Sequence, residues 1–157
     1  MSVIELTTII NAPIHICFDL ARSIDLHKLS TTHTDEEAIA GVTSGLIGEG
    51  EYVTWRATHF GIRQELTSKI TAFEYPYFFR DEMLKGIFKK IKHDHRFETD
   101  GELTEMKDSF EFESPLGFLG HLFNYFVLKT YLTELLVKRN QLIKKVAESN
   151  EWNHCKK

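Results

Sequence analysis

The sequence has only two cysteines, little net charge and no basic N-terminal segment. Cys17 and Cys155 match no metal-binding or redox spacing, so we expect no structural disulfide and a cytoplasmic location. The net charge of −4, with a pI near 6.1, argues against a nucleic-acid partner, because such a partner requires a basic face. Residues 1–13 do not show a basic stretch followed by an apolar run, so we expect no signal peptide.

The sequence also lacks an uninterrupted apolar run. The most apolar stretch, from Pro115 to Leu136, is interrupted by polar side chains: His121, Asn124, Lys129, Thr130 and Glu134. A membrane span requires about 20 mostly apolar residues, so we expect a buried helix and no transmembrane segment. The basic residues of the C-terminal region are interpreted as the solvated face of that helix. They are Lys138, Arg139, Lys144, Lys145, Lys156 and Lys157.

What is present is an ordinary globular composition with many phenylalanines. Of the 157 residues, 42% are hydrophobic and 27% are charged, which predicts one domain over residues 1–150 and a polar tail over 151–157. The twelve Phe could fill a core or line an apolar pocket, because both use the same side chains. Composition does not distinguish the two, and it leaves the oligomeric state open.

Local patterns predict an α+β order of elements. A strand over 3–10 is followed by a helix that opens at Pro13 and by a short helix over 25–29, capped by Ser23 or Asp25. Further strand patterns start near residue 37 and end at 113, and a long helix follows. The expected strands are 51–60, 62–73, 77–84, 88–98 and 103–113, and the expected long helix is 118–148. Consecutive strands with tight connections predict an antiparallel sheet of six to seven strands that curves around the long final helix.

The turn between the last two strands sets their expected register. If Asp100 and Gly101 are the two loop residues, His93 pairs with Asp108 and His95 pairs with Met106. Residues two apart on a strand share a face, so both histidines point inward with Phe97. A carboxylate therefore lies beside an imidazole in an apolar setting.

Several stretches, taken together, resemble the START-like or SRPBCC superfamily. They are Asn11-Ala12-Pro13, the run from Trp55 to Gln64, Phe79-Arg80-Asp81-Glu82 followed by Gly86 and Phe88, the segment His93 to Glu98, and Ser114-Pro115-Leu116-Gly117. Their order is similar to a bacterial ligand-binding branch sometimes labelled cell-division-inhibitor-like. The resemblance implies a helix-grip fold with an internal cavity, and it implies no single chemistry because the superfamily includes carriers, enzymes and regulators. Ile91 departs from the branch, where Trp is frequent, so the cavity could have a different shape.

The first functional hypothesis is binding of a small hydrophobic molecule, such as a lipid, isoprenoid, quinone or polyketide-like aromatic compound. Phe and Trp side chains would hold its apolar body, and a few polar groups would orient it. The expected cavity wall is Trp55, His59, Gln64, Phe79, His93, His95, Asp108, Phe110 and Phe126. No cofactor is expected.

Four other interpretations are weighed against this hypothesis. His93 and Asp108 could form a buried hydrogen bond that only joins two strands. In a cyclase or dehydratase, His93 oriented by Asp108 would act as a general base. A metal site from His59, His93 and His95 is considered and not adopted, because the third ligand rests on uncertain strand positions. An interaction or regulatory module would be favoured by a packed interior without a cavity.

Overall fold

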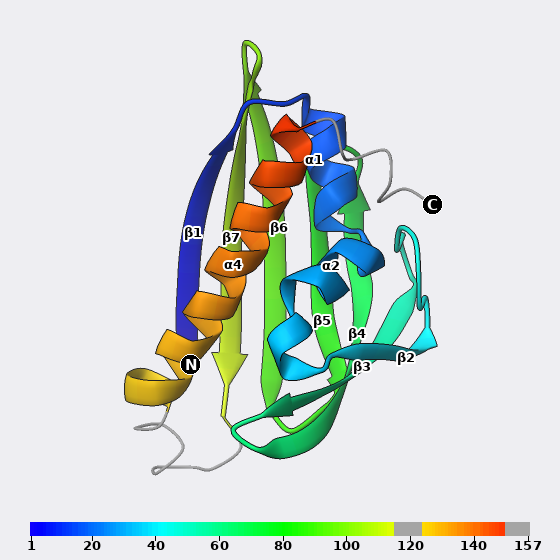
Figure 1. Cartoon of the computed structure of the whole chain (residues 1–157), viewed down its shortest axis with the longest axis vertical. Helices are drawn as coiled ribbons and strands as arrows, with labels where there is room; N and C mark the ends of the chain where they lie inside the picture. Colours follow the sequence, from blue (N-terminus) through cyan, green and yellow to red (C-terminus); the bar gives the residue numbers. More distant parts are fainter. Residues whose placement is uncertain (115–123, 150–157) are drawn as a thin grey trace.

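A curved antiparallel sheet and a long helix form the frame of the protein (Figure 1). The computed structural model describes residues 1–114 and 124–149. The helices are α1 (Ile14–Ala21), α2 (Ile24–Ser30) and α4 (Lys129–Glu148), with a 3-10 turn at Thr32–Thr34 and a π-helical turn at Asn124–Leu128. The strands are β1 (Ser2–Ile10), β2 (Glu37–Gly41), β3 (Tyr52–His59), β4 (Ile62–Glu74), β5 (Phe78–Lys85), β6 (Lys90–Asp100) and β7 (Leu103–Glu113).

The seven strands lie in the order β1-β7-β6-β5-β4-β3-β2, and every neighbouring pair is antiparallel. Only β1 is out of chain order, because α1 and α2 separate it from β2. Figure 1 shows α4 lying across the concave face of this sheet, with α1 and α2 beside it. This arrangement confirms the predicted helix-grip architecture. Among the described residues, no helix is long and apolar enough to cross a membrane.

Local signals explain where the short helices begin. Pro13 precedes α1 in an extended conformation, and its missing N–H removes one of the donors that would lack a partner at the helix start. The Ser23 hydroxyl accepts a hydrogen bond from the Leu26 amide at the start of α2, which identifies Ser23 as the cap. The long helix ends at Glu148 as predicted, and its predicted start at residue 118 lies outside the described residues.

The predicted register of the β6–β7 hairpin is wrong by two residues. Asp100 pairs with Leu103, so the loop residues are Gly101 and Glu102, and His95 faces Asp108. Gly101 has a φ of +63°, which a glycine adopts without strain at the first loop position. Because the shift is even, every side chain keeps its predicted face.

The apolar core lies mainly between the sheet and α1 with the C-terminal half of α4. Phe18 of α1 is fully buried, and its ring packs against Phe73, Phe79 and Phe97 at centroid distances of 5.2–5.3 Å. Toward the other end of the sheet the side chains do not fill the interior, and a cavity remains.

Candidate cavity and its polar cluster

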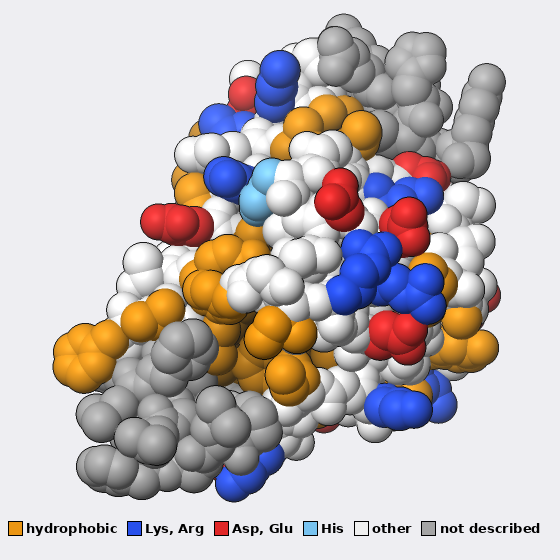
Figure 2. Space-filling model, turned by 60° about the horizontal axis from the view of Figure 1, so that its bottom comes forward, with side chains coloured by type: hydrophobic (Ala, Val, Ile, Leu, Met, Phe, Trp, Pro, Cys, Tyr) orange, Lys and Arg blue, Asp and Glu red, His pale blue; other side chains and the backbone are white. Residues whose placement is uncertain are grey.

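The cavity has a volume of about 440 Å³ and lies between the concave face of the sheet, α2 and the first turns of α4. Its wall is largely apolar and includes Trp55 and Leu66 from the sheet and Leu132 from α4. Phe60, Ile62 and Ile87 line it and are also 53%, 59% and 49% exposed, so it opens to solvent beside them. Figure 2 shows hydrophobic side chains gathered around a hollow at this end of the molecule.

Seven of the nine residues expected in the wall lie in it: Trp55, His59, Gln64, Phe79, His93, His95 and Phe110. Strand alternation explains this agreement, because inward positions follow from the period of two. Asp108 is not in the wall, since its carboxylate is fully buried behind the two histidines. The expected wall position of Phe126 is wrong: the side chain is 67% exposed, because the π-helical turn carries it away from the cavity.

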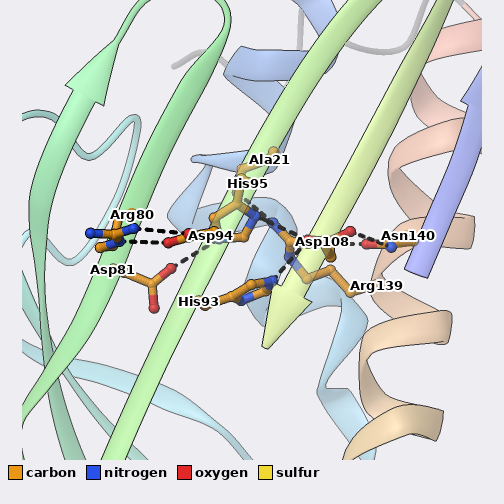
Figure 3. Close-up of polar contacts among 9 residues, drawn as sticks. All are labelled: Ala21, Arg80, Asp81, His93, Asp94, His95, Asp108, Arg139 and Asn140. Carbon is orange, nitrogen blue, oxygen red and sulfur yellow. Dashed lines mark hydrogen bonds and ion pairs between the residues drawn. The ribbon is translucent and has the colours of Figure 1, made fainter. Parts of the chain in front are cut away.

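Asp108 joins the two strand histidines to the long helix (Figure 3). Its Oδ1 lies 2.8 Å from Nε2 of His93 and 3.1 Å from Nδ1 of His95. From α4, Asn140 donates a hydrogen bond of 2.7 Å to Oδ2, and Arg139 lies 3.6 Å from Oδ1. The predicted contact between His93 and Asp108 is therefore present, as a diagonal pair on one face and not as directly paired residues.

The interpretation of Arg139 as a solvated helix residue is wrong. The residue is 6% exposed, and its guanidinium donates to Asn140 Oδ1 at 3.0 Å and to the Ala21 carbonyl at 2.9 Å. Its position explains this, because Arg139 lies four residues from Leu135 and from the fully buried Ile143 on the inward stripe of α4. A buried guanidinium requires a counter-charge, and Asp108 provides it.

Asp81 completes the polar cluster from the opposite side. Its Oδ2 lies 2.9 Å from Nε2 of His95, and the side chain reaches into the cavity wall from β5 (Figure 3). Sequence reasoning did not include Asp81 in the expected wall. The sequence does indicate this position, because Asp81 is two residues from the inward-facing Phe79 on the same strand and therefore shares its face.

Burial and neighbouring charges set the protonation of this cluster. Burial opposes ionisation of Asp108, but hydrogen bonds from His93 and His95 and the charge of Arg139 hold its pKa well below the ordinary value. Burial also opposes ionisation of Asp81, and the hydrogen bond from His95 and the nearby cations still lower its pKa. Burial, followed by the charge of His95, lowers the pKa of His93. Near neutral pH, Asp81 and Asp108 are therefore carboxylates and His93 is a neutral imidazole.

A second polar group lies elsewhere in the wall. Nε2 of His27 is 3.3 Å from Oε1 of Glu36, and the His27 ring lies 4.3 Å from the ring of Trp55. Nδ1 of His59 is 2.6 Å from the Tyr131 hydroxyl of α4. His27 was not among the residues expected in the wall, and the short helix α2 turns its side chain toward the cavity.

Comparison with solved structures gives matches over nearly the whole chain. The protein TTHA0849 from Thermus thermophilus has a TM-score of 0.70 and 18% identity, covering 90% of this chain and 97% of that one. A START superfamily protein from Mycobacterium smegmatis has a TM-score of 0.69 and 10% identity, covering 94% and 98%. The ginseng major latex-like protein 151 from Panax ginseng has a TM-score of 0.66 and 16% identity, covering 93% and 97%.

Sequence comparisons add nothing to this result, since no family model and no curated protein matches the chain. At such low identity the structural matches establish the fold alone. Together with the seven-stranded sheet and the long C-terminal helix, they show that the chain has the START-like, or SRPBCC, helix-grip fold.

Proposed function

We propose that this protein binds a small, mainly apolar molecule that carries a polar group. The observation that carries the proposal is the cavity of about 440 Å³ with its largely apolar wall. Ligand sites for small molecules usually have volumes of roughly 300–1,000 Å³ and combine apolar walls with a few placed polar groups. Lipids, isoprenoids, quinones and polyketide-like aromatic compounds all meet that description.

The wall suggests how such a molecule would be held. Trp55, Phe79 and Phe110 supply aromatic surface for its body. His93 and His95 supply polar atoms at one place in the wall, and His59 lies in the other polar group. In this proposal Asp108 does not contact the ligand, and its carboxylate orients the His93 ring through the hydrogen bond to Nε2.

A pair of substitutions on one strand tests the proposal. Ser68 lines the cavity, whereas the next residue, Lys69, points to the opposite face of β4. Ser68→Phe places an aromatic ring inside the cavity, and Lys69→Phe places the same ring outside it. Binding of an apolar fluorescent naphthalene sulfonate is measured by its emission and by quenching of the fluorescence of the two tryptophans, of which Trp55 lines the cavity.

We expect saturable binding by the wild type, at least a tenfold loss in Ser68→Phe, and little change in Lys69→Phe. Native mass spectrometry of the purified protein complements the titration, because a retained hydrophobic compound would add a reproducible mass. If the wild type shows no saturable binding, or if both variants lose it equally, the cavity is not a ligand site.

One observation favours the enzyme as a second candidate. His93 lines the cavity as a neutral imidazole, with Nε2 hydrogen-bonded to Asp108 at 2.8 Å, so Nδ1 remains as a proton acceptor. A cyclase or dehydratase would use this nitrogen as its general base. In that case His93→Ala should abolish turnover of a bound compound while largely preserving its affinity; a parallel loss of both would indicate a binding contact.

A further inference from the structure

Three metal-ligating side chains converge on one point of the cavity wall. Asp81 of β5 and His93 and His95 of β6 each offer a potential ligand atom, and these atoms lie within 4.8 Å of one another. A tetrahedral ion with metal–ligand bonds of roughly 2.0–2.2 Å holds its ligand atoms about 3.4 Å apart. Small side-chain rotations would therefore bring the three ligand atoms to coordination distance. His59, which sequence reasoning had grouped with the two histidines, is not part of this group, and Asp81 takes its place.

Both histidine rings turn one nitrogen toward the same carboxylate. Nε2 of His93 is hydrogen-bonded to Asp108, and Nδ1 of His95 lies 3.1 Å from it. Histidine ligands of metals almost always present their second ring nitrogen to a carboxylate or carbonyl in this way. The nitrogens that remain are Nδ1 of His93 and Nε2 of His95, and the latter faces Asp81 at 2.9 Å.

The charges around this point favour a cation. Asp81 and Asp108 contribute two carboxylates, and Arg139 is the one Lys or Arg side chain that pairs with either of them among the described residues. Nη2 of Arg139 also lies 3.5 Å from Nδ1 of His95, so Nε2 is the nitrogen of this ring that is directed to Asp81. A metal ion between Nε2 of His95 and Asp81 would replace the hydrogen bond that joins them.

We propose that Asp81, His93 and His95 form a mononuclear site for a divalent transition metal ion. Two imidazoles and one carboxylate with open positions suit Zn²⁺ or Fe²⁺. Asp108 acts as the positioning residue that orients both rings. Since all three ligands line the cavity, the open positions face a bound molecule. The inference does not depend on the proposed apolar ligand, because metal binding is measured without one.

The test uses the untagged full chain, stripped with a chelator and titrated with Co²⁺ as a spectroscopic probe. Stoichiometric d–d absorption bands are expected in the wild type, and Zn²⁺ should displace them. Asp81→Asn keeps the shape and a hydrogen-bond acceptor but removes the ligand charge, and it should weaken Co²⁺ binding by at least 100-fold. Glu36→Gln is the matched control, because Glu36 is another carboxylate beside a histidine in the same wall, and its affinity should be unchanged.

A measurement on the wild-type protein alone tests the proposal even if a variant fails to fold. In long-range ¹H–¹⁵N spectra of the histidine rings, Zn²⁺ should shift Nδ1 of His93 and Nε2 of His95 and leave His59 unchanged. A wild type without stoichiometric Co²⁺ bands, equal losses in Asp81→Asn and Glu36→Gln, or ring shifts confined to other histidines would each overturn the proposal. The hydrogen bond between His95 and Asp81 would then account for their proximity.

Discussion

Replacing Asp108 with asparagine removes a buried negative charge while keeping the shape of the side chain. The Asp108 and Arg139 side chains are 0% and 8% exposed. Removing one partner of such a pair typically costs about 3–5 kcal/mol, because the other charge stays buried without compensation. Here Arg139 keeps hydrogen bonds to Asn140 and to the Ala21 carbonyl, which offset part of that loss. We therefore expect the free energy of unfolding to fall by about 3 kcal/mol.

The assay is urea unfolding followed by circular dichroism at pH 7, together with thermal melts. A loss of about 3 kcal/mol corresponds to a decrease of roughly 6–12 °C in melting temperature for a chain of this size. Asp94→Asn is the matched control, because Asp94 on the neighbouring strand β6 also pairs with an arginine, Arg80 of β5, but the Arg80 side chain is 31% exposed. There the expected loss is only about 1 kcal/mol.

A double-mutant cycle measures the coupling between the buried Asp108 and Arg139 side chains. If Arg139 is destabilising once Asp108 is neutral, the variant Asp108→Asn/Arg139→Met should be more stable than the sum of the two single losses predicts, with a coupling of about 0.5–3 kcal/mol. A loss in Asp108→Asn no larger than that in Asp94→Asn, or strictly additive effects, would refute the account of a buried charge cluster.

Three further outcomes follow from the structure. Hydrogen bonding to Arg80 lowers the pKa of Asp94. The ion pair therefore stabilises the fold at neutral pH, and this contribution is lost as the pH falls below about 4. In urea titrations, the difference in free energy of unfolding between the wild type and Asp94→Asn should disappear over that range. Phe18→Ala should cost about 3–5 kcal/mol in the same assay, since it empties the fully buried centre of the core. Gly41→Ala should lower the melting temperature and reduce the free energy of unfolding by roughly 1–3 kcal/mol. Gly41 has a φ of +73°, and a Cβ there would overlap the Tyr52 carbonyl. An unchanged melting temperature would exclude strain at this position.

The architecture was predictable because its signals are local and periodic. Alternating residues predicted the inward faces of β3, β4, β6 and β7, and the resulting wall positions, such as Trp55, His93 and Phe110, agree with the structure. The hairpin register was not predictable to the residue, since either Asp100-Gly101 or Gly101-Glu102 satisfies a turn that requires a glycine with positive φ.

The polar cluster was only half predictable. His93 and Asp108 share a hairpin, so strand pairing alone brought them close. Arg139 and Asn140 reach the cluster from α4, and a charged residue on a helix is usually interpreted as solvated unless its tertiary partner is known. Asp81 joins it through the β5–β6 pairing, which rests on a turn with a weaker sequence signal. Long-range packing, and not local pattern, assembles these residues.

The polar contacts of α4 are unevenly distributed along its length. The second half is fixed to Asp108 of the sheet through Asn140 and Arg139, and its last turns reach β1 and the following loop through Lys144 and Glu148. Among the described residues of the first half, the side-chain hydrogen bond to the sheet is that of Tyr131 with His59, and the other contacts are apolar cavity walls. The helix is thus anchored at its C-terminal end. Separating its first turns from the sheet would therefore break fewer polar contacts than separating its last turns, which hold the buried charges behind the histidines.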